Sequence, residues 1–229
     1  MEKVLQPLSK QLLFTANGFT AEMCIDPESL AIAHNLRYRA YLHAGAIPVN
    51  PKETFTDEYD PQRNVRTYLV WYEDRPVASV RSLTWSAKYD WLPTDCTVLF
   101  EQDINEHLGP KTPILESNRF VVDPEFKGRK SLMAQMLLFR VQAIGAVVDQ
   151  CEYVITAVRP RHASFYKRLM KFDPISEPLA VDKVTFPIQL LATPVASREK
   201  LAESSPMAAY AEADVERYAT LIQQLSTQQ

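Results

Sequence analysis

The sequence is poor in glycine and cysteine, with 5 Gly and 3 Cys among 229 residues. Cys24, Cys96 and Cys151 are odd in number and show neither CxxC nor Cys/His spacing. This pattern argues against a zinc site and in favour of a reducing compartment. Residues 1–7 lack the apolar core of a signal peptide. We therefore expect a cytoplasmic protein without a metal site.

The sequence also lacks an internal repeat and any known nucleic-acid-reading motif. Its formal net charge is −3, and 46% of its residues are hydrophobic, which is ample for one domain with a core. Positive charge is concentrated in residues 127–171, which hold nine Lys or Arg and two Asp or Glu. This segment predicts an anionic partner, but the acidic chain as a whole disfavours nucleic acid.

Residues 116–132 predict a strand, a basic glycine turn and a helix. Glu116 and Arg119 lie ahead of a short apolar run that ends at Asp123, and the turn around Gly128 leads into a long apolar helical pattern. A helix N-terminus carries unpaired N–H groups and a positive dipole end, which suit a phosphate. The alternative is an ordinary connection with solvated lysines.

The rest of the chain predicts further strands and helices. Asn17-Gly18 predicts a hairpin over residues 11–25, and Asp26-Pro27 predicts the start of a helix that ends near Gly45. An acidic loop over residues 48–61 follows. The remaining strands are expected at residues 67–72, 77–83, 114–123, 153–158 and 184–191, and the remaining helices at residues 131–148, from Pro160, and after a cap at Ser205-Pro206.

This order of elements predicts a single α/β (α+β) domain with a mixed, mostly antiparallel sheet flanked by helices, over residues 1–195. Residues 196–229 predict an amphipathic helix that packs on the domain or on a partner. Residues 131–148 are apolar almost all round. Because Arg140 in their middle would be costly in lipid, we expect a buried core helix and no stable membrane insertion.

Several dispersed motifs resemble known acyltransferases. The run from Val121 to Arg129, the long helix, the strand over residues 153–158 and the segment over residues 163–169 resemble the acyl-CoA-binding core of the GNAT superfamily. More narrowly, the chain is similar to the acyl-homoserine-lactone synthases. The similar positions are the helix residues Arg37 and Tyr41, the loop acids Asp57 and Asp60, the strand residue Arg81, and Glu116 with Arg119.

Two departures shift the resemblance within this group. Phe55 stands at the position of the first loop acid, and Lys130 at that of the second turn glycine. A weakened glycine turn leaves room for the single phosphate of a carrier-protein pantetheine, and an aromatic ring suits an uncharged, flat acceptor side chain. The chain therefore resembles the long-chain N-acyl amino acid synthases, including the N-acyltyrosine synthases.

This resemblance implies transfer of a long-chain fatty acyl group from acyl carrier protein to the amine of a free amino acid, with tyrosine as the expected acceptor, by direct attack on the thioester and without a cofactor. Three alternatives are kept: an acyl-homoserine-lactone synthase, a CoA-dependent acetyltransferase of small amines, and a non-catalytic module that binds an acylated carrier. Intact Glu116 and Arg119 favour catalysis.

The reaction needs a base near the amine, donors for the oxyanion and a proton for the thiolate. Glu116 is the candidate base, since a partly desolvated carboxyl at a strand edge has a raised pKa; a salt bridge with Arg119 is its alternative role. The resemblance implies backbone donors in residues 120–122 and a proton from Tyr166. Arg37, Arg81 and Arg119 either grip a substrate carboxylate or hold the two loop acids.

The predicted site has three groups of residues. The catalytic group is Glu116, Arg119 and Tyr166. The substrate-binding group is Arg37, Tyr41, Asp57, Asp60, Arg81, Phe120 and Val122, with Leu132, Met133, Met136 and Leu137 lining an acyl tunnel between the strands at residues 114–122 and 153–158, or else packing in the core. The carrier-binding group is Lys127, Gly128, Arg129, Lys130, Arg159 and Arg161.

Overall fold

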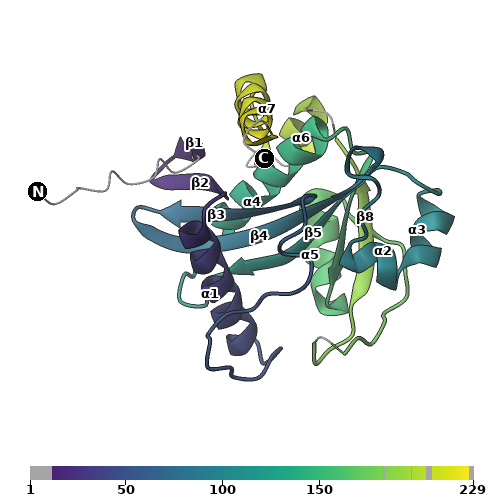
Figure 1. Ribbon diagram of the computed structural model, residues 1–229, viewed down its shortest axis with the longest axis horizontal. Helices are drawn as coiled ribbons and strands as arrows, with labels where there is room; N and C mark the ends of the chain where they lie inside the picture. The colour runs from purple at the N-terminus through teal and green to yellow at the C-terminus, as the bar shows by residue number, and fades with distance from the viewer. Residues whose placement is uncertain (1–11, 183, 197, 205–207, 227–229) are drawn as a thin grey trace, which may run out of the picture.

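The computed structural model describes residues 12–182, 184–196, 198–204 and 208–226 (Figure 1). Eight strands form one sheet in the order β1-β2-β3-β4-β5-β6-β8-β7. Every neighbouring pair is antiparallel except β5 and β6, which confirms the mixed, mostly antiparallel sheet. The strands are β1 (Leu12–Ala16), β2 (Phe19–Cys24), β3 (Val65–Tyr72), β4 (Arg75–Trp85), β5 (Ile114–Val122), β6 (Tyr153–Val158), β7 (Asp173–Pro174) and β8 (Gln189–Pro194).

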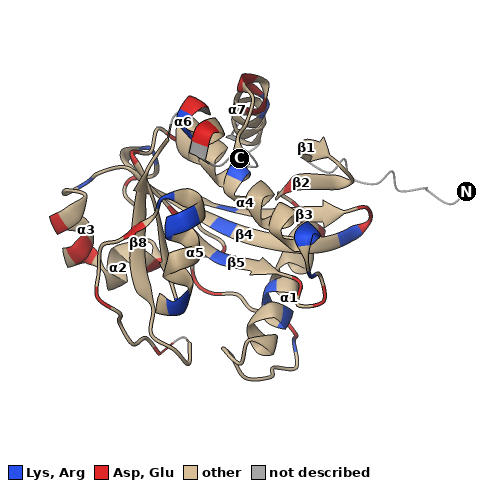
Figure 2. Ribbon diagram, turned by 180° about the vertical axis from the view of Figure 1, so that it is seen from behind, with Lys and Arg blue, Asp and Glu red and all other residues tan. Residues whose placement is uncertain are grey.

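Helices lie on both faces of this sheet (Figures 1 and 2). They are α1 (Pro27–His43), the 3₁₀ turn η1 (Ala87–Tyr89), α2 (Asp95–Leu99), α3 (Glu101–His107), α4 (Arg129–Val148), α5 (Pro160–Met170), α6 (Arg198–Ser204) and α7 (Glu212–Ser226). Helices α4, α5 and α7 share one apolar core with the first four strands. Helix α1 packs on the other face, and α2 and α3 pack near β5, β6 and β8.

The predicted turn and cap chemistry is present in the N-terminal third. Asn17 and Gly18 have φ of 51° and 78°, the left-handed pair that a tight hairpin requires. The Asp26 carboxylate accepts a hydrogen bond from the Ser29 amide at 2.9 Å and so caps α1. The helix ends at His43, and Gly45 follows with φ of 65°. These local predictions are confirmed.

Helix α4 is a core helix. In the described part of the chain it alone is long and apolar enough to cross a membrane, and 56% of its most apolar window is buried inside the protein. Its buried side chains include Ala134, Leu138, Val141 and Ile144, which belong to the main core cluster. This burial is that of a helix packed against a sheet.

The C-terminal predictions need correction. The strand predicted at residues 184–191 runs instead over Gln189–Pro194, and the preceding residues form a loop that lines a cavity. The proposed cap at Ser205-Pro206 lies outside the described residues. Helix α7 begins at Glu212, because Ala208 and Tyr210 are buried ahead of it and the Asp214 carboxylate accepts from the Ala211 amide at 2.8 Å. Helix α6 was not predicted.

Helix α7 is held on the domain by buried polar contacts. The Tyr218 and Tyr68 hydroxyls lie 2.5 Å apart, and Arg66 donates to Tyr218 at 3.3 Å. Arg66 also pairs with Asp149 at the end of α4. A Cβ atom at Gly145 of α4 would lie 2.9 Å from the Tyr218 hydroxyl oxygen, so glycine leaves the room that this hydroxyl fills.

We predict that Gly145→Ala lowers the free energy of unfolding by about 1–3 kcal/mol, because overpacking displaces the bonded Tyr218 hydroxyl. In a Tyr218→Phe background the obstructing oxygen is gone, so the same change should cost less or stabilise through the roughly 1 kcal/mol helix preference of alanine over glycine. Urea unfolding of the four proteins of this cycle measures the difference. An equal cost in both backgrounds would contradict the prediction.

Candidate active site

A cavity of about 740 Å³ opens where two neighbouring strands separate. The parallel pairing of β5 with β6 begins at Ile114 and Tyr153 and ends at Glu116 and Ile155. Beyond this point β5 continues beside β4, and β6 continues beside β8. The cavity wall is completed by the C-terminal half of α1, by α2, by the start of α5 and by the loop over residues 179–188. The sheet therefore supplies two strand edges that face each other across the cavity.

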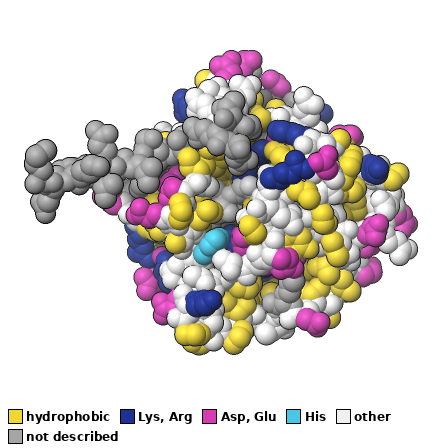
Figure 3. Space-filling model, viewed as in Figure 1, with side chains coloured by type: hydrophobic (Ala, Val, Ile, Leu, Met, Phe, Trp, Pro, Cys, Tyr) yellow, Lys and Arg dark blue, Asp and Glu magenta, His cyan; other side chains and the backbone are white. Residues whose placement is uncertain are grey.

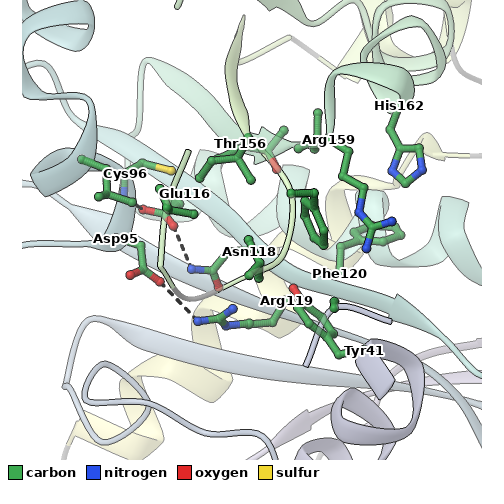
Figure 4. Close-up of a pocket in the computed structure, with 18 of the residues that line it drawn as sticks. Tyr41, Asp95, Cys96, Glu116, Asn118, Arg119, Phe120, Thr156, Arg159 and His162 are labelled. Carbon is green, nitrogen blue, oxygen red and sulfur yellow. Dashed lines mark hydrogen bonds and ion pairs between the residues drawn. The ribbon is translucent and has the colours of Figure 1, made fainter. Parts of the chain in front are cut away.

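Glu116 lies on the cavity wall and is fully buried (Figure 4). Its Oε1 accepts from Asn118 Nδ2 at 2.8 Å, and its Oε2 accepts from the Cys96 amide at 2.9 Å. Burial and the charge of Asp95 raise the pKa of this carboxyl above its usual value. Glu116 thus has the raised pKa expected of a base. Its backbone is paired on both sides, with β4 and with β6, so it does not lie on an edge strand, and its side chain makes no salt bridge with Arg119.

Three arginines and three aspartates form an ion-pair cluster beside Glu116. Arg81 contacts Asp57 at 2.5 and 3.0 Å, Asp60 at 3.0 Å and Asp95 at 3.4 Å. Arg119 contacts Asp57 at 2.6 Å and Asp95 at 3.6 Å, and Arg37 contacts Asp60 at 3.0 Å. Of the two roles expected for these arginines, the structure contains the second: they hold the loop acids.

The cluster fixes the charge of Asp57. Burial acts to raise the pKa of Asp57. Hydrogen bonds and charge from Arg81, and then the charge of Arg119, outweigh burial and hold this pKa well below its usual range. The side chains of Arg37 and Arg81 have no exposed surface. The loop over residues 48–61 is therefore attached to the sheet by buried charge, since neither partner is easily left alone.

Aromatic rings surround the outermost arginine of the cluster. The guanidinium carbon of Arg119 lies 4.7 Å from the Phe55 ring centre and 5.9 Å from that of Tyr41. The Tyr41 and Phe55 rings are themselves 4.8 Å apart. Tyr41 and Arg119 line the cavity. Phe55 packs against both of these residues and so helps to hold this part of the cavity wall.

A β-bulge interrupts β5 at the cavity. Ser79 pairs with Val121 and Arg81 with Asn118, so one residue of β4 faces both Arg119 and Phe120. Arg119 has φ of 52°, a left-handed conformation that is uncommon for a residue with a side chain. Bulges of this kind change the direction of side chains and end regular pairing next to active sites. Here the bulge sends Arg119 toward the loop acids and Phe120 toward Phe139 of α4.

Tyr166 of α5 reaches the cavity from the opposite face of the sheet. Its ring packs against Phe139 and Phe172 at 5.7 Å, and the residue lines the cavity. Burial and the nearby Tyr41 raise the pKa of the Tyr166 hydroxyl. The hydroxyl is therefore protonated at neutral pH and can donate a hydrogen bond.

The predicted acyl-tunnel side chains lie elsewhere. Met136 and Leu137 are buried in the main core, Leu132 and Met133 pack against it, and none of the four lines the cavity. The expectation that they line it is wrong, because they fill the space between α4 and the sheet. The cavity instead takes apolar surface from α2 and from residues 179–182 and 184–188, including the exposed side chains of Val98, Leu99 and Leu179. Figure 3 shows that apolar side chains are frequent on one face of the molecule.

The predicted carrier-binding residues form two groups. Arg159 and Arg161 line the cavity at the start of α5. Lys127, Gly128, Arg129 and Lys130 are exposed at the start of α4, where Gly128 has φ of 77°, and they do not line the cavity. Val122 at the end of β5 does line it, so the chain runs from the cavity directly into the basic turn.

Sequence reasoning missed Asp95, Cys96, Asn118 and Thr156, which all line the cavity. Asn118 lies two residues after Glu116 on one strand, a spacing that places both on one face and so was available from the sequence. Asp95 and Cys96 belong to α2, and no motif or periodic pattern in the sequence around them indicated a site. No group of three or more His, Cys, Asp or Glu within the described ranges is arranged to hold a metal ion.

Comparison with known proteins gives one family and a consistent set of folds. The sequence model of the family "FeeM: N-acyl amino acid synthase FeeM" matches residues 32–194. No curated protein matches the sequence. Among solved structures, FeeM, an N-acyl amino acid synthase from uncultured soil microbes, is 14% identical with a TM-score of 0.65, covering 83% of this chain and 96% of that chain.

Two synthase structures of a related kind share the fold. The AHL synthase LasI has a TM-score of 0.63 at 14% identity, covering 85% of this chain and 96% of that chain. The CoA-dependent acyl-homoserine lactone synthase BjaI has a TM-score of 0.59 at 15% identity, covering 85% and 92%. At these identities the structures show the GNAT-like fold, which confirms the predicted fold class.

The ion-pair cluster leads to a prediction about stability. Asp57→Asn keeps the shape of the side chain but leaves Arg81 and Arg119 without their shared charge, so we expect a loss of about 3 kcal/mol in the free energy of unfolding at pH 7. As a control, Asp90→Asn breaks an exposed pair with Arg63 and should leave that free energy nearly unchanged.

The same variant has a signature in pH. The pKa of Asp57 is depressed in the folded protein. Its contribution to the free energy of unfolding is therefore fully present above the unfolded carboxyl pKa of about 3.9, and is lost progressively as the pH falls from that value toward the folded pKa. The difference between wild type and Asp57→Asn should therefore shrink on acidification from about pH 5 to pH 2. Urea unfolding across this range measures it, and a constant difference would argue against the cluster.

Proposed function

Because the chain belongs to the N-acyl amino acid synthase FeeM family, it is an N-acyltransferase, and we propose that it moves a long-chain fatty acyl group from acyl carrier protein to the amine of free tyrosine. One observation carries the proposal. The separation of β5 from β6 brings the buried carboxylate of Glu116, the β5 bulge and the hydroxyl-bearing residue Tyr166 to one cavity.

Glu116 is proposed to take the proton of the acceptor ammonium, directly or through one water. An ammonium has no free electron pair, so it must lose this proton before it attacks the thioester carbonyl. A raised carboxyl pKa makes Glu116 a stronger base than an exposed glutamate. Its hydrogen bonds to Asn118 and the Cys96 amide fix the direction of the carboxylate.

The amine nitrogen then forms a bond to the carbonyl carbon, and the carbonyl oxygen becomes an oxyanion. Backbone N–H groups of residues 120–122, next to the bulge, are the proposed donors to this oxygen. When the tetrahedral intermediate collapses, the carbon–sulfur bond breaks and the pantetheine sulfur leaves as a thiolate. The nitrogen loses two protons in becoming an amide. Glu116 passes the first, taken from the ammonium, to water; it then takes the second from the nitrogen of the tetrahedral intermediate and delivers it to the sulfur, so the products are the amide, the free thiol and one proton in solution, and no cofactor is needed.

Tyr166 is proposed to donate a hydrogen bond to the departing sulfur. Its raised pKa makes it a weaker acid than a thiol, whose ordinary pKa is about 8.5. It therefore stabilises the thiolate without giving up its proton. The proposal thus gives Tyr166 the role of a hydrogen-bond donor in place of the proton donor that the resemblance implies.

An acyl carrier protein is the proposed donor because basic side chains are exposed beside the cavity. Lys127, Arg129 and Lys130 lie on the turn that follows the cavity-lining end of β5. Asp123 holds this connection through contacts with Arg39 at 3.1 Å and Arg75 at 3.0 Å. A fixed basic turn suits the acidic surface of a carrier and the phosphate of its pantetheine arm.

Tyrosine is the proposed acceptor because aromatic side chains surround the cavity beside the ion-pair cluster. Tyr41, Tyr59 and Phe120 line it, and Phe55 supports Tyr41 and Arg119 from behind. Such a wall suits a flat, uncharged ring.

We predict that a long-chain acyl carrier protein plus free tyrosine gives N-acyltyrosine, that other aromatic or large apolar amino acids react more slowly, and that S-adenosylmethionine gives no lactone. A mass-spectrometric screen of free amino acids and S-adenosylmethionine with one acylated carrier measures this, and release of carrier thiol reports turnover. Lactone without acylated amino acid would place the chain with the acyl-homoserine-lactone synthases. Carrier binding without thiol release would show a binding module.

A second prediction concerns the carrier. The pair R129E/K130E should raise the KM for acyl carrier protein by about tenfold at low salt and leave the KM for free acyl-pantetheine almost unchanged, because rim charges act on association of the protein partner. Lys111→Glu, an exposed lysine beyond the other end of β5, serves as the control. Equal effects on both donors would show that the turn does not dock the carrier.

A further inference from the structure

Asn118 connects the ion-pair cluster to Glu116. It lies on β5 directly opposite Arg81 of β4 and lines the cavity (Figure 4). Its side-chain oxygen accepts from Arg81 Nε at 2.8 Å, and its Nδ2 donates to Glu116 Oε1 at 2.8 Å. A guanidinium group only donates hydrogen bonds, so the amide oxygen must face Arg81 and the NH₂ group must face Glu116.

We propose that Asn118 is a positioning residue of the acyl transfer, which holds the Glu116 carboxylate in one direction as a hydrogen-bond acceptor. The proposal rests on the role of Glu116 as the base. No motif of the sequence assigned a function to Asn118, and it needs no contact with substrate to act in this way.

The orientation is fixed from the far side of the amide. Each nitrogen of the Arg81 guanidinium has a partner: Nε has Asn118, and the two terminal nitrogens have the carboxylates of Asp57, Asp60 and Asp95. Arg81 is fully buried, so it has little freedom to turn. The loop acids thereby fix the orientation of the Arg81 guanidinium. Arg81 fixes the orientation of the Asn118 amide, and this amide fixes the direction of the Glu116 carboxylate.

The other groups around Glu116 show why this donor matters. From α2, Asp95 opposes ionisation of Glu116, while the Cys96 amide and the Thr94 hydroxyl favour it, and the Cys96 thiol lies beside it. From β4, the charge of Arg81 favours the ionised form. Burial opposes it most strongly. Asn118 adds a direct hydrogen bond that favours the charged carboxylate. Without this bond, burial and Asp95 should raise the pKa of Glu116 further.

The test compares Asn118→Ala, Asn118→Asp and the control Ser117→Ala in the full chain, with acyl carrier protein and saturating tyrosine over pH 5.5–9. Ser117 is the buried neighbour whose hydroxyl does not line the cavity. We expect Asn118→Ala to lower kcat at neutral pH and to move the acid limb of the kcat profile up by about one to two pH units, with the rate recovering at higher pH and little change in the KM for tyrosine. Asn118→Asp places a second carboxylate beside Glu116 and should move the limb further, and Ser117→Ala should match wild type.

Glu116→Gln completes the comparison. It should lower kcat by at least about a hundredfold without recovery at high pH, and adding Asn118→Ala to it should cost nothing further, because both changes act on one base. Asn118→Ser, which keeps a short donor, replaces Asn118→Ala should the latter melt below the assay temperature. A rate loss that does not depend on pH, a change in KM alone, or additive effects in the Glu116→Gln background would overturn the role of Asn118. Absence of any product from wild type would instead overturn the proposed reaction.

Discussion

The buried ion pair between Asp57 and Arg81 is the interaction on which the active-site side of the molecule depends. It joins a loop without regular structure to the middle of the sheet, where the Arg81 side chain is fully buried and the Asp57 side chain is 8% exposed, so the loss of either partner leaves the other charge poorly solvated. Through this pair the loop, α1 and β4 keep one arrangement, because Arg37 repeats the same link to Asp60. A cluster of this kind contributes little net stability compared with apolar packing, but it permits very few geometries. That restriction is what an active site needs.

The cavity follows from a second constraint, the connection between two parallel strands. Helix α4 joins β5 to β6, and the two strands pair only over their first residues before each continues with another neighbour. Backbone N–H and C=O groups on the facing edges are then left without strand partners, and buried groups of this kind require other partners. In the proposed reaction an extended pantetheine arm and the thioester carbonyl would be such partners. The proposal therefore assigns both binding and oxyanion stabilisation to the same separated edges.

Polar contacts order the site outward from Glu116. Glu116, the proposed base, is buried, and a buried carboxyl resists ionisation. Donors from α2 and from Asn118 offset this effect. The donors are themselves oriented by Arg81 and the loop acids. On the opposite face of the sheet, Arg66, Asp149 and Tyr218 attach the C-terminal helix in a similar way. Both faces thus combine apolar packing with a small number of hydrogen-bonded polar groups.

The sequence by itself determined the local structure: the Asn17-Gly18 turn, the Asp26 cap and the strand at residues 153–158. Those features depend on backbone conformation and spacing along the chain, which neighbouring residues decide. The resemblance to known acyltransferases, and not local spacing, predicted the grouping of Glu116 with the arginines and loop acids. Only the tertiary structure decided that the arginines hold the loop acids, that Glu116 is buried, that the α4 methionines lie in the core, and that Asp95 belongs to the site. These facts depend on which strands separate, on the bulge at Arg119 and on the helix α2 formed within a stretch without periodicity, and such contacts between distant segments leave no pattern in a single sequence.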